Sequence, residues 1–176
     1  MHKANPWQKA YRDMTPVQRK KKLEWNTYYK RRENIYNLSN AMWKDSNHFR
    51  ALTLSVSKPM GLSQFNYKLQ YLRRTLKKEL GTDIFSTHII VRAISPETGF
   101  YHAHISLFDV DTSISDTQYR GAITKVWKHG SCDFRQLSKN IYAWNEYVIK
   151  NISPDNPQML REKGAVLITH SAVTLI

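Results

Sequence analysis

Two apolar runs separated by a short turn stand in the middle of the chain, and they constrain its fold more than any other feature. Residues 84–94 and 100–108 are rich in aromatic and β-branched side chains. Between them, residues 95–99 (Ser-Pro-Glu-Thr-Gly) have the composition of a turn. We therefore predict an antiparallel β-hairpin, in which alternate residues of each strand face opposite sides of a sheet.

Strand and helix patterns on both sides of the hairpin extend it to an α+β fold. Residues 49–56 alternate apolar and polar side chains, as a half-buried strand does. Ser63 can cap a helix whose apolar residues recur at helical spacing from Phe65 to Leu80, and Gly81 stands in the stop position. Further elements are expected in the order helix, strand, helix and strand, over residues 116–130, 132–136, 140–151 and 165–175. This order predicts a ferredoxin-like split βαβ fold with a central antiparallel sheet.

The chain is short and strongly basic. Its 176 residues are enough for one domain with a sizeable core. It carries 27 Lys and Arg against 14 Asp and Glu, which gives a formal net charge of +13. This excess makes a polyanion the expected partner, with nucleic acid ahead of an anionic membrane. The alternative is a basic protein that binds no polyanion.

The first 47 residues differ in composition from the rest of the chain, because basic and aromatic residues are interleaved there. We therefore divide the chain into a basic, aromatic N-terminal arm (1–47) and a main domain (48–176). Thr15-Pro16 can open a helix in this arm. The cations of the arm are expected to follow nucleic-acid phosphates while the rings among them stack on bases. Alternatively, the rings pack the arm onto the main domain, and both can hold. The predicted phosphate contacts are Lys20, Lys21, Lys22, Arg31 and Arg32.

The sequence carries no sign of export. Cys132 is the only cysteine, so an intrachain disulfide is excluded and a reducing compartment is expected. No apolar stretch approaches the roughly 18 residues of a membrane span. The first residues lack the apolar core of a signal peptide. We therefore expect an intracellular protein that has no membrane partner.

A pair of histidines, His102 and His104, lies in the second strand of the predicted hairpin. Because residues two apart in a strand project from the same face, both imidazoles can bind one metal ion. Two imidazoles rarely hold a catalytic divalent ion alone, so an oxygen ligand is expected as well. Glu97, in the turn before the strand, is the first candidate for the third ligand, and His88 on the partner strand is the second. The expected ion is Mg²⁺ or Mn²⁺.

About forty residues downstream, a predicted helix carries Tyr147 and, three residues later, Lys150. Ile141, Trp144 and Val148 form an apolar stripe that can pack this helix on the sheet. Tyr147 could then attack a phosphodiester, with Lys150 offsetting negative charge or lowering the pKa of the phenol. Either pattern alone more often marks ordinary packing or surface residues, so the interpretation depends on their joint order and spacing.

In these motifs the chain resembles the HUH endonucleases, and most closely the rolling-circle replication initiators (Rep proteins) of phages, plasmids and viruses. An apolar strand with threonine at residues 51–55, the His102-Ala103-His104 pair and the Tyr147-x-x-Lys150 motif match the three family motifs in order. Glu97-x-Gly99 resembles the acidic residue that often precedes the histidines. Residues 127–130 (Trp-Lys-His-Gly) resemble a Trp-x-x-Gly segment of phage-type initiators, so Trp127 and Lys128 are expected to contact DNA. The resemblance covers about residues 49–151.

The resemblance implies an HUH endonuclease fold and a DNA nickase and ligase that starts rolling-circle replication. Such an enzyme cleaves single-stranded DNA, or one strand of an origin hairpin, and keeps a 5′-phosphate on Tyr147. The sequence has no Gly-x-x-x-x-Gly-Lys-Ser/Thr motif, so a separate helicase is expected, together with a DNA polymerase. The implied location is the cytoplasm of a prokaryotic host, or the host nucleus for an element of eukaryotic viral origin.

Three alternatives remain open from the sequence. A single-tyrosine HUH transposase of the insertion-sequence type would share fold, metal and nucleophile, although Lys150 and the segment 127–130 favour an initiator. A conjugative relaxase would need a third histidine clustered with the pair, and the sequence shows none. A non-catalytic nucleic-acid-binding module of ferredoxin-like fold would bind without metal and form no covalent product.

Overall fold

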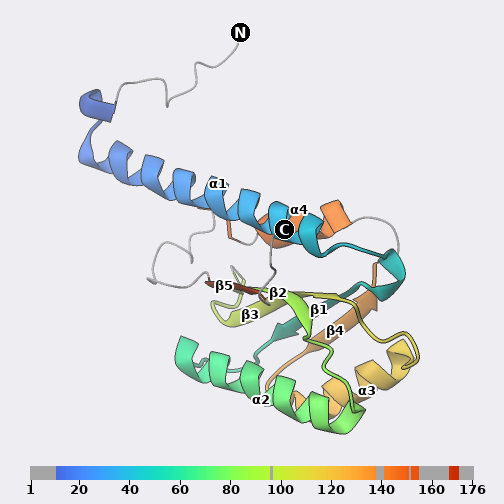
Figure 1. Ribbon diagram of the computed structural model, residues 1–176. Helices are drawn as coiled ribbons and strands as arrows, with labels where there is room; N and C mark the ends of the chain where they lie inside the picture. Colours follow the sequence, from blue (N-terminus) through green and yellow to red (C-terminus); the bar gives the residue numbers. More distant parts are fainter. Residues whose placement is uncertain (1–10, 96, 138–140, 151, 155–166, 171–176) are drawn as a thin grey trace.

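The computed structural model describes residues 11–95, 97–137, 141–150, 152–154 and 167–170. Over these residues the protein is an α+β fold in which helices cover both faces of an antiparallel sheet (Figure 1). The strands are β1 (Arg50–Ser55), β2 (Thr87–Ile94), β3 (Tyr101–Phe108), β4 (Cys132–Gln136) and β5 (Leu167–His170). The helices are α1 (Pro16–Met42), α2 (Leu62–Leu80), α3 (Asp116–Val126) and α4 (Ile141–Lys150), with short 3₁₀ helices at Tyr11–Asp13 and Ser46–His48.

The five strands lie in the order β4-β1-β3-β2-β5, and each neighbouring pair is antiparallel. Because β1 and β2 both run antiparallel to β3, which lies between them, they run parallel to each other and are joined by α2. The predicted α+β class and the central antiparallel sheet are therefore confirmed. The predicted hairpin is formed by β2 and β3, with His104 opposite Val91 and His102 opposite Ala93.

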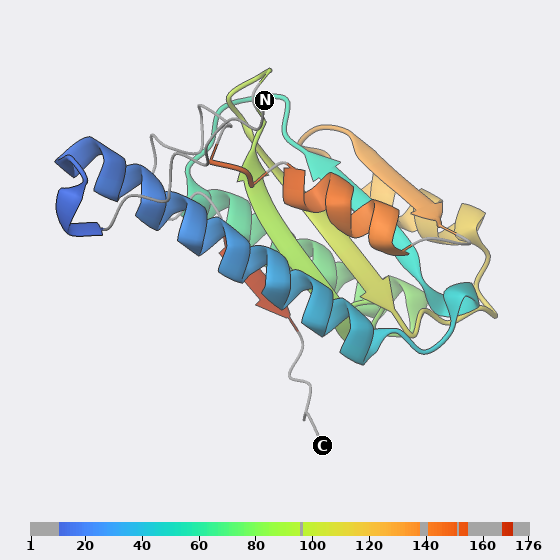
Figure 2. The same cartoon turned by 90° about the horizontal axis from the view of Figure 1, so that it is seen from above.

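Each face of the sheet is covered by two helices, and Figures 1 and 2 show the two layers. We call the face under α2 and α3 the lower face and the face under α1 and α4 the upper face. The lower face is mainly apolar and packs on the buried stripe of α2 and on α3. Its largest contributors from the sheet and α2 are Leu52, Leu54, Ile105, Leu107, Phe65, Leu72 and Leu76.

The upper face is covered by α4 and by the C-terminal half of α1. Ile35, Leu38 and Met42 of α1 are buried in the same cluster as Trp144 and Val148 of α4. The N-terminal half of α1 extends past the sheet (Figure 2). In the described residues, the arm contains one long helix that is anchored to the sheet at its C-terminal end. Its rings and aliphatic side chains pack against the main domain there, as the second interpretation of the arm expected.

Capping explains where the helices begin and end. The Thr15 hydroxyl accepts a hydrogen bond from the Gln18 backbone N–H, and the Gln18 side chain accepts one from Thr15 N–H, so the predicted start of α1 is confirmed. The N-cap of α2 is Gly61 rather than the predicted Ser63, because the earlier start packs Leu62 against the lower core. Gly81 ends α2 with a φ of +70°, as predicted.

Two further predicted boundaries differ from the structure by three residues or more, and a third can be compared only in part. Strand β2 begins at Thr87 rather than residue 84, because the Asp83 carboxylate accepts the Phe85 N–H and holds residues 83–86 in a turn. Helix α3 ends at Val126, before the predicted residue 130, because the Trp127 ring turns inward and donates from Nε1 to the Ser55 carbonyl. Of the predicted strand 165–175, the described part is β5, and the rest lies outside the described residues.

None of the helices in the described parts of the chain is long and apolar enough to cross a lipid bilayer.

Candidate active site on the upper face of the sheet

His102 and His104 lie side by side on β3 and project from the upper face. Their ring centroids are 4.7 Å apart, and the side chains are 6% and 2% exposed. Across the sheet they stand opposite Ser55 and Thr53 of β1. The strand alternation that was predicted to bring both imidazoles to one face is therefore present.

Two ring nitrogens of the pair are buried and have no hydrogen-bond partner among the residues that the structure describes. His104 Nδ1 lies 3.2 Å from the Thr53 hydroxyl, which fixes the orientation of the ring. His104 Nε2 and His102 Nδ1 are buried and have no hydrogen-bond partner in the described parts of the chain. A buried polar atom without a hydrogen-bond partner lowers the free energy of unfolding by about 1–3 kcal/mol. The two nitrogens therefore destabilise the folded protein.

Both imidazoles are neutral at pH 7. Burial lowers the pKa of His102, although the Phe100 carbonyl partly offsets it. Burial and then the neighbouring His102 lower the pKa of His104 to about 3. A neutral imidazole is the form that binds a metal ion, so the two unpartnered nitrogens fit a divalent cation as its nitrogen ligands.

The two predicted third ligands do not join the pair. Glu97 is exposed in the hairpin turn, and no group of three His, Cys, Asp or Glu side chains among the described residues is close enough to hold a metal ion. His88 stands opposite Leu107, which puts it on the lower face, on the far side of the sheet from His102 and His104. Its Nδ1 lies 2.7 Å from the Phe85 carbonyl, so His88 is a structural residue.

Tyr147 lies directly against the histidine pair. Its ring centroid is 5.0 Å from that of His104 in an edge-to-face arrangement, and its side chain is 51% exposed. Trp144, one turn earlier on α4, lies 5.6 Å from the Tyr147 ring and donates from Nε1 to the Ser106 hydroxyl at 2.9 Å. The predicted apolar stripe of Ile141, Trp144 and Val148 is buried, so α4 holds one accessible phenol beside two buried imidazoles.

Helix α4 is also tied to α1. The Ser39 hydroxyl donates to the Asn145 side-chain oxygen at 3.1 Å, in a buried contact. Glu146 accepts from Arg32 at 2.8 Å and from the Tyr36 hydroxyl. The helix that carries Tyr147 is thus fixed both by the sheet below it and by the helical arm beside it (Figure 2).

Two cations lie near the phenol. Lys150 is exposed at the end of α4, one turn beyond Tyr147. Arg135 of β4 stands opposite Ala51 on the upper face. Asp133 first, and Tyr147 to a smaller extent, raise the pKa of Arg135, so its guanidinium is within electrostatic range of Tyr147. Arg135 was missed in the sequence because only strand pairing between β4 and β1 brings it to this face.

The predicted DNA contacts fall into three groups. Lys20, Lys21 and Lys128 are exposed, as a phosphate contact requires. Lys22 and Arg31 are half-buried on α1, with Lys22 over the Tyr11 ring, and Arg32 is paired with Glu146. Trp127 is 3% exposed and packs edge-to-face on Phe65, so the prediction that its ring contacts DNA is wrong.

Tyr142, the other tyrosine of α4, does not approach the histidines. Its ring stacks on Tyr36 of α1 at 6.0 Å, on a different side of the helix from Tyr147. The site therefore contains one tyrosine from this helix rather than a pair, in agreement with the helical angle between the two positions.

No family model, no curated protein and no solved structure matches the chain. A function has to be inferred from its own residues and their geometry.

Proposed function

We propose that this protein cleaves and rejoins single-stranded DNA through a covalent 5′-phosphotyrosine on Tyr147, as an HUH rolling-circle initiator does. The observation that carries the proposal is the contact between an accessible phenol and a buried imidazole that is itself paired with a second one. The Tyr147 and His104 ring centroids are 5.0 Å apart, and those of His104 and His102 are 4.7 Å apart. The strand order β4-β1-β3-β2 with α2 as a crossover is the order of a ferredoxin-like split βαβ sheet, which supports the fold assignment.

His102 and His104 would hold a divalent ion, Mg²⁺ or Mn²⁺, through His102 Nδ1 and His104 Nε2. When bound, such an ion supplies Lewis-acid polarisation of the scissile phosphate. Oxygen atoms of the phosphate and of water are suitable further ligands, since neither Glu97 nor His88 joins the pair. Thr53 holds the His104 ring so that Nε2 faces away from β1.

Tyr147 would supply the nucleophile. Its phenolic oxygen attacks the phosphorus, a Tyr–O–P bond forms, and the bond from phosphorus to the 3′-oxygen breaks. The phenol proton passes to water at the exposed edge of the ring, and the departing 3′-oxygen takes a proton from water. The reverse reaction, in which a 3′-hydroxyl attacks the phosphotyrosine, rejoins the strand. Lys150 and Arg135 would offset the negative charge of the phosphate.

The surroundings of Tyr147 suit a single strand. A net charge of +13 favours a nucleic acid, and the accessible edge of Tyr147 can be reached by an unpaired strand. A separate helicase and a DNA polymerase complete the proposed activity, because the nick supplies only a primer. The proposed location is intracellular.

The proposal is tested by incubating the protein with 5′- and 3′-labelled single-stranded oligonucleotides of origin-like sequence and Mn²⁺, followed by denaturing electrophoresis. We expect an SDS-resistant adduct that carries the label of the strand downstream of the nick. Tyr147→Phe should abolish it, and Tyr142→Phe, a matched change on the same helix, should retain it. An adduct that persists in Tyr147→Phe contradicts the assignment of the nucleophile.

A second candidate function is non-catalytic nucleic-acid binding. It is favoured by one observation, that no third metal-ligating side chain gathers with His102 and His104 among the described residues. This reading predicts equal DNA affinity in EDTA and in Mn²⁺ and no adduct on any oligonucleotide. Retained binding together with loss of cleavage in His102→Ala would instead support the metal-dependent nickase.

A further inference from the structure

A cavity of about 500 Å³ lies between α2 and α3, away from the histidine pair. Tyr67, Lys68 and Tyr71 of α2 line one side, and Lys125, Val126, Lys128 and His129 line the other. Its volume is within the range of about 300–1,000 Å³ that is usual for ligand sites. The proposed nicking reaction uses none of these residues.

Two tyrosine rings in this cavity are open to solvent. Tyr67 and Tyr71 are one helical turn apart on α2, and their side chains are 56% and 48% exposed. Residues four apart lie on the same side of a helix, so both rings line the same side of the cavity and present an aromatic surface there. Such a surface suits planar groups, because each nucleic-acid base has a face that stacks on an aromatic ring.

The charge of the cavity is positive. Lys68, Lys125 and Lys128 line it together with one carboxylate, Glu79, which pairs with Lys125. The Lys68 ammonium lies 5.9 Å from the centroid of the Tyr67 ring. Burial first, and then the positive charge of Lys68, lowers the pKa of His129, so this ammonium is also close to the imidazole. Cations beside exposed rings are the combination that binds a single-stranded backbone and its bases.

The cavity adjoins the sheet end at which His102 lies. The His129 carbonyl accepts hydrogen bonds from the Ser57 N–H at 2.8 Å and from the Ser57 hydroxyl at 3.2 Å. Ser55, two residues before Ser57 in the chain, stands opposite His102 in the sheet. The Ser55 hydroxyl lies 2.6 Å from the Ser131 hydroxyl. The segment 127–131 therefore connects the wall of the cavity to the end of the upper face, around the edge of the sheet.

We propose that the cavity between α2 and α3 binds a stretch of single-stranded DNA, with bases stacked on Tyr67 and Tyr71 and phosphates on Lys68 and Lys128. Its role in holding the strand that flanks the nick rests on the proposed function; binding of a single strand does not. A free nucleotide offers the same base and phosphate chemistry, so the experiment includes both ligands.

The test measures the affinity of a fluorescein-labelled oligothymidylate by fluorescence anisotropy in EDTA. Loss of stacking costs about 1–3 kcal/mol per base, so Tyr67→Ala/Tyr71→Ala should weaken binding by about tenfold or more. Lys68→Gln/Lys128→Gln should also lower the slope of log affinity against log salt by about 1.4, since each phosphate contact to a single strand contributes about 0.7.

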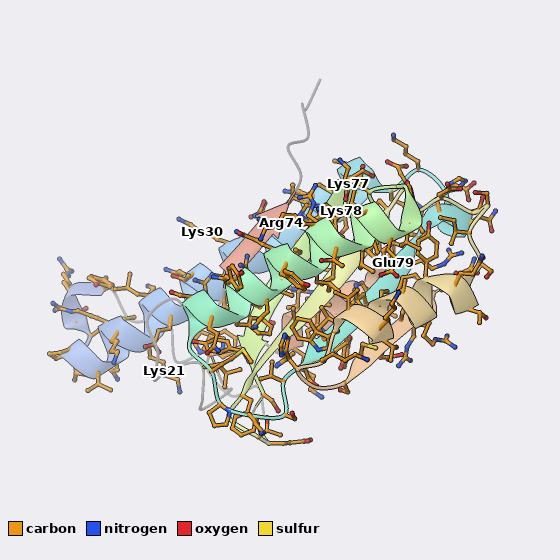
Figure 3. The ribbon with its side chains drawn as sticks, turned by 90° about the horizontal axis from the view of Figure 1, so that it is seen from below. Lys21, Lys30, Arg74, Lys77, Lys78 and Glu79 are labelled. Atoms are coloured by element: carbon orange, nitrogen blue, oxygen red, sulfur yellow. The ribbon has the colours of Figure 1, made fainter. Side chains whose placement is uncertain are left out.

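The control is Arg74→Gln/Lys78→Gln, which removes the same charge from α2 outside the cavity. Figure 3 shows these two residues with Lys77 on the C-terminal half of α2. Circular dichroism and the Tm of each variant check that it is folded. Equal losses in the cavity variants and in the control overturn the proposal, because they indicate attraction by overall charge. Displacement of the oligonucleotide by micromolar thymidine monophosphate also overturns it and assigns a mononucleotide as the ligand.

The binding experiment on the cavity and the adduct assay for nicking can fail independently of each other. If the tyrosine variant loses affinity while the unaltered protein forms no adduct, the cavity proposal stands and the nickase proposal falls. If adducts form normally and the tyrosine variant binds the oligonucleotide as tightly as the unaltered protein, the nickase stands and the cavity proposal falls.

Discussion

The two faces of β3 show how one strand serves two purposes. On the lower face it presents Ala103, Ile105 and Leu107 to the apolar core, and on the upper face it presents His102 and His104. All of these side chains are buried, so exposure does not distinguish the faces. What differs is the balance of interactions, because the lower residues are packed apolar groups and the upper pair leaves two buried nitrogens without a partner in the described residues.

This difference separates the apolar core from the candidate active site. The lower face stabilises the fold through apolar burial, which contributes about 25 cal/mol per Å² of area removed from water. The upper face also packs an apolar cluster, but its histidine pair reduces stability locally, and it does so beside an accessible tyrosine and two cations. A costly polar pair that persists beside reactive groups is typical of a functional site.

The largest effect on stability should follow truncation on the lower face. Leu72 is 1% exposed, and Leu72→Ala should lower the free energy of unfolding by about 2–5 kcal/mol because it leaves a cavity in the core. His102→Leu on the upper face should change it by less than about 1.5 kcal/mol, since it removes a buried unpartnered nitrogen and conserves volume. Urea unfolding measures both. A loss as large for His102→Leu as for Leu72→Ala would remove the contrast between the faces.

The next largest effect is a loss of adduct yield when the residue that orients His104 is changed. Thr53→Val keeps the shape of the side chain and removes its hydroxyl, which lies 3.2 Å from His104 Nδ1. Loss of a residue that orients a metal ligand lowers metal affinity or activity by about 10–100-fold, so we expect a drop of this size in adduct yield at limiting Mn²⁺. Thr27→Val on α1, which removes a hydroxyl bonded to the Leu23 carbonyl, is the control and should leave the yield unchanged.

The upper face should also make stability depend on pH in metal-free protein. Burial lowers the pKa of His104 from 6.5 to about 3, so between these values the unfolded chain binds a proton that the folded protein does not. The stability present above pH 6.5 is therefore lost as the pH falls toward the folded pKa, by up to about 1.4 kcal/mol per unit. Urea unfolding in EDTA at several pH values measures the slope. The same slope in His104→Gln would assign the titration to another group.

The smallest effect is expected at the exposed link between α1 and α4. Arg32 and Glu146 are 43% and 54% exposed, and exposed ion pairs contribute about 0.2–1 kcal/mol. Arg32→Gln should lower the free energy of unfolding by that amount and change DNA affinity no more than Lys21→Gln does. A much larger loss of DNA affinity for Arg32→Gln would restore Arg32 as a direct phosphate contact.

Local patterns in the sequence predicted most of the fold. The strand alternation predicted that His102 and His104 lie on one face of the sheet. The apolar stripe of α4 predicted which side of that helix packs on the sheet. These features depend on periods of two and 3.6 residues, which are visible without knowledge of the partners. Helix α1 was predicted at its start from the Thr15-Pro16 cap for the same reason.

Features that depend on strand pairing or on a distant partner were not predictable. The register between β2 and β3 puts His88 on the lower face, and pairing between β4 and β1 brings Arg135 toward Tyr147. Trp127 was expected to contact DNA from the resemblance of residues 127–130, because nothing local shows that its indole N–H reaches the Ser55 carbonyl. Arg32 was assigned to DNA because its partner, Glu146, is more than a hundred residues away in the sequence.

The central claim is that Tyr147 forms the covalent bond to DNA, and peptide mapping of the adduct tests it most directly. Trypsin should release residues 140–150 as one peptide that contains both Tyr142 and Tyr147, so fragmentation by mass spectrometry compares the two within a single molecule. After nuclease digestion of the adduct, we expect the mass of a nucleotide 5′-phosphate on Tyr147 and an unmodified Tyr142. A nucleotide on Tyr142 or on a residue outside this peptide, or no modified peptide from DNA that the protein binds, would contradict the claim.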